Sequence, residues 1–131
     1  MAKKLEELPI YSKVVEFSNA ITAILDKPGL RREWKLRGQI VEATDSIGAN
    51  MEEGFEQGTD RGFARYVTIS KASTAEVVGH LKRAHRKGHI SADDLKPRVS
   101  MGEELGRMLG GFIKYLHRSD FKDRGRHYDE G

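Results

Sequence analysis

The sequence of 131 residues contains no cysteine. Disulfides, thiolate metal sites and a cysteine nucleophile are therefore excluded, and a reducing compartment fits. No apolar run approaches the ~20 residues that span a bilayer. The amino-terminal residues are charged and are not followed by the apolar stretch of a signal peptide. These absences predict a cytoplasmic protein.

The sequence also lacks the common signatures of catalysis. Di-iron helical bundles carry a Glu-x-x-His motif on two helices, and this chain has none. A Gly-x-Ser-x-Gly nucleophile elbow and a glycine-rich phosphate loop are absent as well. We therefore predict no catalytic residues, no metal site and no cofactor, and we expect the protein not to be an enzyme.

Apolar residues recur with the period of a helix that buries one face, in four successive segments. The segments begin near residues 10, 30, 60 and 91, and about three to six residues connect them, which favours antiparallel neighbours. The sequence thus predicts an all-α, antiparallel up-down four-helix bundle of one domain, residues 1–118. Residues 119–131 lose the periodicity, and we expect them to form a flexible tail.

The third predicted helix has two distinctive faces. Its apolar seam steps by four and three residues, as in a coiled coil, through Phe63, Val67, Ser70, Thr74, Val77, Leu81 and Ala84. At ~100° per residue, the opposite face carries small residues. These are Thr68, Ala72, Ala75 and Gly79. Because a glycine inside a helix costs ~1 kcal/mol relative to alanine, we predict that this stripe is a subunit interface. The alternative is an ordinary solvated surface.

Charge is distributed unevenly, although the net charge is only +3. Residues 40–60 contain six acids and no Lys or Arg. Six cations flank the small residues on the third helix. They are Arg61, Arg65, Lys82, Arg83, Arg86 and Lys87. These residues are candidates for nucleic-acid binding through phosphate contacts, and the alternative is a solvated charged face. Trp34, beside Arg31, Arg32, Lys35 and Arg37, could stack on a base or pack at the end of the bundle.

The stretch Gln39-Ile-Val-Glu-Ala-Thr-Asp-Ser-Ile-Gly-Ala-Asn-Met-Glu-Glu-Gly54 resembles the signature of a known family. It is the four-helix-bundle family encoded by intervening sequences of bacterial 23S rRNA genes, with the pattern Q-L-R-R-A-x-x-S-I-P-A-N-I-A-E-G. Residues 60–77 are similar to the third helix of that family. The resemblance implies a cytoplasmic homopentamer, a ring of bundles, with suspected nucleic-acid binding and no established enzymatic activity. A related branch, the accessory proteins of diversity-generating retroelements, engages RNA and a reverse transcriptase.

Two departures from the family pattern matter. Its basic pair is Val41-Glu42 here, which puts nucleic-acid binding through the second helix in doubt, and its proline is Gly48. Five polar or small residues match, and we expect them to form a structural network between helices two and three. They are Asn50, Glu53, Gly54, Ser73 and Glu76.

Two functions follow from the sequence. The first is a non-enzymatic, oligomeric bundle that binds RNA or DNA, with a reverse transcriptase or another protein as a further partner. The second is a protein–protein interaction scaffold that binds no nucleic acid and uses its acidic second helix or its tail. The mild net charge does not separate the two.

Overall fold

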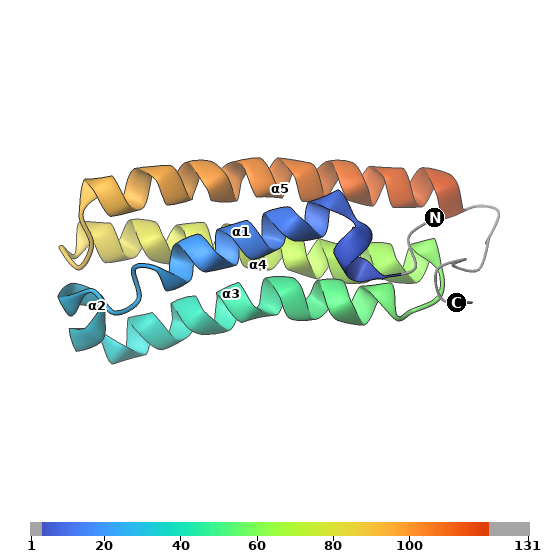
Figure 1. Ribbon diagram of the computed structural model, residues 1–131. Helices are drawn as coiled ribbons and strands as arrows, with labels where there is room; N and C mark the ends of the chain where they lie inside the picture. The colour runs from blue at the N-terminus through green and yellow to red at the C-terminus, as the bar shows by residue number, and fades with distance from the viewer. Residues whose placement is uncertain (1–3, 121–131) are drawn as a thin grey trace.

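The protein is described by a computed structural model in which residues 4–120 are placed. The elements are η1 (Leu5–Glu7), α1 (Pro9–Thr22), α2 (Pro28–Arg32), α3 (Trp34–Phe55), α4 (Asp60–Arg86) and α5 (Ala92–Asp120). No strand occurs among the residues placed. Figure 1 shows α1, α3, α4 and α5 side by side, with successive long helices running in opposite directions and α2 at one end. The predicted all-α class and the bundle-like packing are confirmed.

The helix α4 forms the centre of the packing. It contacts both α3 and α5 along its length, and α1 contacts the same two helices. All seven residues of the predicted seam are at most 1% exposed. On α1 and α3 the apolar residues that recur at helical spacing, for example Val14, Phe17 and Ile47, are buried too. On α5 the same spacing includes Leu95, Val99 and Phe112, which are only partly buried. The apolar periodicity therefore predicted the buried faces of α1, α3 and α4, and that of α5 in part.

Local signals in the sequence fix the ends of α4 and α5. Thr59 caps α4, and its Oγ1 accepts a hydrogen bond from the Gly62 amide at 3.0 Å. Ser91 caps α5 in the same way, because its Oγ accepts from the Asp94 amide at 3.0 Å. Gly88 ends α4 with a positive φ of 81°, a conformation that glycine adopts without strain. The starts of α4 and α5 agree with the segments predicted to begin near residues 60 and 91.

The predicted second helix, from about residue 30 to residue 57, is divided in the structure. The backbone leaves the helical conformation at Glu33, with φ −102° and ψ 65°, so α2 ends there and α3 begins at Trp34. Leu30 is fully buried at the end of the bundle, and α2 must turn to place it there. On one continuous helix Leu30 and Leu36, six residues apart, would point ~120° away from each other, so the break at Glu33 allows both side chains to be buried.

The predicted tail, residues 119–131, lies largely outside the described residues. Ser119 and Asp120 belong to α5, and the Ser119 Oγ donates to the Asp60 Oδ2 at 2.7 Å. No helix in the described part of the chain is sufficiently long and apolar to cross a membrane.

Candidate functional site

The outward face of α4 carries the stripe of small residues without cover from the rest of the chain. All four, Thr68, Ala72, Ala75 and Gly79, are exposed. A Cβ atom placed on Gly79 would meet nothing within 4 Å. Beside the stripe, Ile69 is 45% exposed and lines a shallow hollow with Arg65, Tyr66 and Thr68. The fold of a single chain therefore does not explain why α4 has small and apolar residues here.

The six predicted nucleic-acid-binding cations lie at the two ends of this stripe. Arg61 and Arg65 are exposed at one end, and Lys82, Arg86 and Lys87 are exposed at the other. Arg83, at the second end, is partly buried, and its Nη2 lies 2.5 Å from the His80 Nδ1. Among the described residues, Arg65, Lys82, Arg86 and Lys87 make no ion pair. Their charges are available to an anionic ligand.

A polar network does join α3 to α4, through a partly different set of residues. The Ser46 and Ser73 Oγ atoms are 2.9 Å apart, and the Asn50 Nδ2 donates to the Ser46 carbonyl at 2.8 Å and to its hydroxyl at 2.9 Å. One turn earlier on α4, the Ser70 Oγ donates to the Ile47 carbonyl at 2.8 Å. Ser46 was not among the predicted network residues, although it belongs to the same motif as Asn50.

The other three predicted network residues have different surroundings. Glu53 is exposed, and its carbonyl accepts a hydrogen bond from the Gln57 side chain. Glu76 is also exposed, and its carboxylate lies 3.5 Å from His80 on its own helix. Gly54 is buried, and a Cβ there would come within 2.7 Å of the Tyr66 Cβ. The structure thus brings Asn50 and Ser73 together, packs Gly54 against α4, and leaves both glutamates outside.

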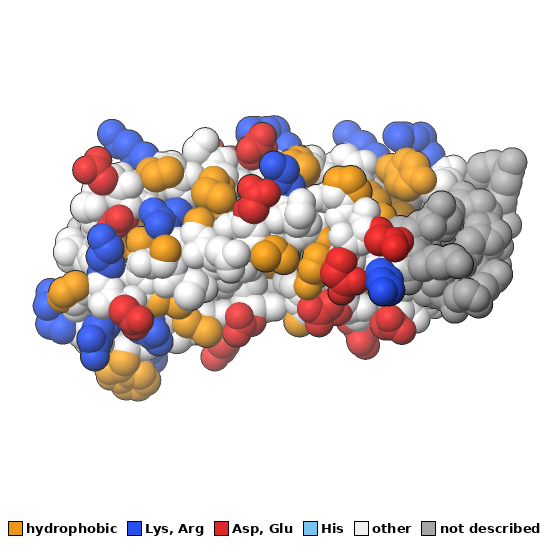
Figure 2. Space-filling view, in the orientation of Figure 1, with side chains coloured by type: hydrophobic (Ala, Val, Ile, Leu, Met, Phe, Trp, Pro, Cys, Tyr) orange, Lys and Arg blue, Asp and Glu red, His pale blue; other side chains and the backbone are white. Residues whose placement is uncertain are grey.

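The helix α2 joins two basic segments that are distant in the sequence. A side chain on Gly29 would collide with the backbone carbonyl of His89, so α2 packs directly on the α4–α5 turn. The Lys27–Asp94 pair at 3.3 Å and the Glu33–His89 pair at 3.9 Å link the same parts. Residues 27–37 and 79–90 together hold nine Lys and Arg and one acid. Figure 2 shows Lys and Arg side chains gathered at this end of the visible face. We call it the basic end.

A second groove runs between α1 and α3. Val15, which is 41% exposed, lines it together with Gly48, Ala49 and the acidic Asp45 and Glu52. At its edge the Tyr11 hydroxyl donates to the Glu52 Oε2 at 3.1 Å. Burial raises the pKa of Tyr11, and the hydrogen bond and negative charge of Glu52 raise it further. The groove combines small residues, an exposed aliphatic side chain and negative charge.

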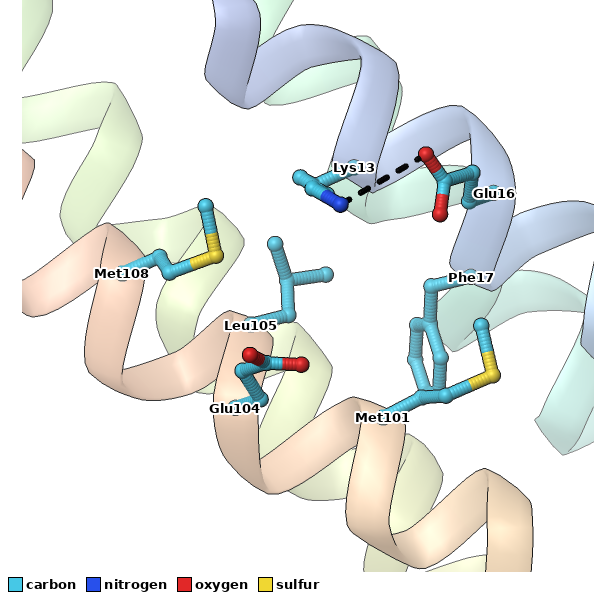
Figure 3. Close-up of a pocket in the computed structure, with 7 residues that line it drawn as sticks. All are labelled: Lys13, Glu16, Phe17, Met101, Glu104, Leu105 and Met108. Carbon is cyan, nitrogen blue, oxygen red and sulfur yellow. Dashed lines mark ion pairs between the residues drawn. The ribbon is translucent and has the colours of Figure 1, made fainter.

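The cavity between α1 and α5 is too small to hold an organic substrate. Its volume is about 70 Å³, whereas ligand pockets measure roughly 300–1,000 Å³. Figure 3 shows its lining, in which Lys13 and Glu16 form an ion pair of 3.8 Å beside Phe17 and the methionines of α5. No group of three or more potential metal ligands occurs within residues 4–120.

Comparison with models of protein families identifies one family for this chain. The family model described as 23S rRNA-intervening sequence protein matches residues 6–111. No curated protein matches significantly. A similar solved structure is the crystal structure of a protein with unknown function from the S23 ribosomal protein family of Bacteroides thetaiotaomicron VPI-5482. It has a TM-score of 0.71 and 23% sequence identity, and the likeness covers 80% of this chain and 98% of that chain. At this identity, the likeness shows a shared fold.

Proposed function

The chain belongs to the family of 23S rRNA-intervening sequence proteins, and from this premise we propose that it is a non-enzymatic, cytoplasmic helical bundle that self-associates and binds nucleic acid, RNA in particular. The bundle supplies a rigid frame, and the assembly repeats its cationic surface. In the retroelement branch that is related to this family, a reverse transcriptase is a further partner. The observation that carries the proposal is the outward face of α4, where uncovered small residues lie between two groups of cations, most of them exposed.

Self-association is supported by two complementary surfaces. A closed ring is built from head-to-tail contacts, which require two different patches on each subunit. The stripe on α4 allows close approach of a neighbouring backbone because it has no long side chains. The α1–α3 groove offers small residues and negative charge to receive it. We propose that these two patches meet between neighbouring subunits of a ring, a pentamer as the resemblance implies.

Static light scattering tests the assembly. At micromolar concentration the wild-type protein is expected to have the mass of several chains, and Ala75→Glu is expected to reduce it, because a carboxylate would then be buried in the contact. Ser100→Glu places the same charge on an exposed position of α5 and is expected to leave the mass unchanged. A wild-type mass equal to one chain would contradict this part of the proposal.

Nucleic-acid binding is supported by the cations at the end of α4. Lys82, Arg86 and Lys87 are exposed and make no ion pair among the described residues. Contacts with phosphates release condensed counterions, so the affinity falls steeply as salt increases. A ring would multiply these contacts by the number of its subunits.

Fluorescence anisotropy with labelled structured RNA and duplex DNA tests the binding. Between ~50 and ~200 mM salt the affinity is expected to fall by orders of magnitude if several phosphates are contacted. The double change Arg83→Glu and Arg86→Glu is expected to abolish binding without unfolding the bundle. Lys114→Glu with Arg118→Glu, which makes the same change of charge on exposed positions of α5, is the matched control. Absence of binding at ~50 mM salt would refute nucleic-acid binding.

The acidic surface of α3 supports a second candidate function, a protein-interaction scaffold. Glu42, Asp45, Glu52 and Glu53 are exposed on this helix, and Glu56 is exposed directly after its last residue. A basic protein partner would bind there and would not need the cations of α4. Loss of partner binding on charge reversal of α3, together with no binding of RNA or DNA, would favour the scaffold.

A further inference from the structure

Trp34 is the most exposed large hydrophobic side chain in the described part of the protein. Its exposed fraction is 76%, compared with 48% for Tyr115 and 45% for Ile69. An indole is costly to leave in water, because a tryptophan normally buries a large area on folding. Packing at the end of the bundle, one of the two interpretations of the sequence, therefore does not account for Trp34. Its ring is available to a ligand.

Three unpaired cations surround Trp34 in the sequence. Arg31 and Arg32 lie in the last turn of α2, and Lys35 follows Trp34 directly. All three side chains are exposed, and within residues 4–120 none of them makes an ion pair. The other two cations of residues 27–37, Lys27 and Arg37, have partners, and Lys27 pairs with Asp94. The Arg37 guanidinium bonds to the Leu25 carbonyl at 3.0 Å and to Asp26 at 3.3 Å.

The one acid in the segment is held away from these cations. The Glu33 carboxylate lies 3.9 Å from the His89 Nε2, on the side of α2 that packs against the α4–α5 turn. The close contact at Gly29 also brings the end of α4, with Arg86 and Lys87, to the same end of the bundle as α2. The indole therefore lies in a region of concentrated positive charge that comes from two parts of the chain.

An exposed indole, flanked in the sequence by exposed guanidinium and ammonium groups without ion pairs, has the chemistry of a single-strand nucleic-acid site. Every base offers a face that can stack on an aromatic ring, and cations track the backbone phosphates. A duplex hides its base faces in the stack, so it would use the cations and not the ring. An acidic peptide would satisfy the charges but has no flat group in each residue to cover the indole. Charge and ring together favour unpaired nucleotides.

We propose that Trp34 stacks on an unpaired base and that the basic end is a binding site for single-stranded nucleic acid, with Arg31, Arg32 and Lys35 contacting the phosphates. This inference rests on the proposed nucleic-acid binding and deepens it. It places the contact that selects the kind of nucleic acid at the basic end, and not on the outward face of α4. It also assigns a preference for unpaired over paired strands, which the cations of α4 alone would not produce.

Trp34 is the only tryptophan in the chain, so emission excited selectively from tryptophan, and not from the four tyrosines, reports on this site alone. The full-length protein is titrated with unlabelled 15-nucleotide RNA and DNA single strands of the same sequence, and with the corresponding duplexes, at ~50 mM salt. Both single strands are expected to quench the emission of Trp34, and the duplexes to quench it weakly. If only the RNA strand quenches, the ribose hydroxyl takes part in recognition.

Anisotropy with labelled single strands supplies an independent measure of affinity. Trp34→Ala is expected to weaken single-strand binding by about tenfold or more, the order of one lost stacking contact, and to leave duplex binding unchanged. Trp34→Phe should restore part of the loss, because phenylalanine keeps a smaller ring. Tyr115→Ala removes another exposed aromatic side chain, on α5, and is the matched control with unchanged affinity expected.

The outcomes separate this inference from the proposed function. Single strands that bind without quenching Trp34, and with the same affinity in Trp34→Ala, would overturn the inference and leave nucleic-acid binding in place. No binding of any nucleic acid would overturn both. A blue shift of the emission that depends on protein concentration alone would show that a second copy of the chain covers Trp34, and this too would overturn the inference.

Discussion

Serine hydroxyl groups make hydrogen bonds between α4 and α3 at two positions, one helical turn apart. Ser73 bonds to Ser46, and Ser70, which is fully buried, bonds to the Ile47 carbonyl. A buried hydroxyl without a partner would cost about 1–3 kcal/mol. These pairings therefore explain how two serines can face a core that is otherwise apolar, and they favour one register of α4 against α3.

Tyr11 gives a prediction about pH. Burial and the neighbouring Glu52 raise its pKa above the ordinary value of 10.0, so the folded protein holds the phenol proton more tightly than the unfolded chain. The stabilising contribution is complete below that ordinary value and is lost as the pH rises toward the raised pKa. The free energy of unfolding should fall less in Tyr11→Phe than in wild type between about pH 8 and about pH 10.5.

Urea unfolding followed by circular dichroism at the two pH values checks this prediction. Tyr115→Phe, on the exposed side of α5, controls for the loss of a phenol elsewhere in the chain. Equal losses of stability in wild type and Tyr11→Phe would show that the contact with Glu52 does not distinguish the two protonation states.

At the residue scale, the sequence predicted positions better than contacts. The motif identified Asn50, Gly54 and Ser73, which do lie between α3 and α4. It also suggested Glu53 and Glu76, which point to solvent. Helical spacing determines on which side of its own helix a side chain lies, but the position of the neighbouring helix determines whether a residue at the edge of that side is covered.

At the scale of the helices, two glycines on α3 have opposite surroundings. Gly54 lies in the last turn of α3, next to the connection to α4. An added Cβ there would meet the Tyr66 Cβ at 2.7 Å and the Phe63 Cδ1 at 2.8 Å. Around Gly48 an added Cβ would meet nothing within 4 Å. The first glycine therefore serves helix packing, and the second does not serve it within one chain.

This contrast predicts that a change from glycine to alanine alters the free energy of unfolding in opposite directions at the two positions. Gly54→Ala should lower the free energy of unfolding by about 1–3 kcal/mol, the typical cost of overpacking. Gly48→Ala should raise it by roughly 0.5–1 kcal/mol, because alanine is the better helix former. Urea unfolding of both variants at a protein concentration where the chain is a monomer makes the comparison. A Gly54→Ala protein as stable as wild type would mean that α4 can move away without loss.

The elements themselves could be predicted because each long helix buries a narrow apolar face. The faces of α1, α3 and α4 were all identified from the period of their apolar residues. The break at Glu33 was not predicted, although Leu30 and Leu36 are both buried and their spacing of six residues would place them ~120° apart around one continuous helix. The contact that separates α2 from α3 involves His89, more than fifty residues away, and spacing carries no information about it.

At the scale of the whole molecule, the contact between Gly29 and His89 connects the first half of the chain to the second. Because the obstacle to a side chain at position 29 is backbone, the two segments would have to separate to admit one. Gly29→Ala should therefore lower the free energy of unfolding by about 1–3 kcal/mol. Gly38→Ala, on α3 with nothing within 4 Å of an added Cβ, should be neutral or stabilising. Thermal unfolding of the two variants measures the difference, and equal midpoints would contradict it.

The separation of charge between the two ends of the bundle affects how the protein meets a ligand. Positive charge is concentrated where α2 meets the end of α4, whereas residues 50–60, at the far end of α3, hold four acids and no Lys or Arg. In these parts of the described chain, positive and negative charge are thus separated along the long axis of the bundle. A polyanion at a distance would rotate the molecule so that Trp34 arrives first, which speeds productive encounters and makes the association rate fall faster with salt than the dissociation rate rises.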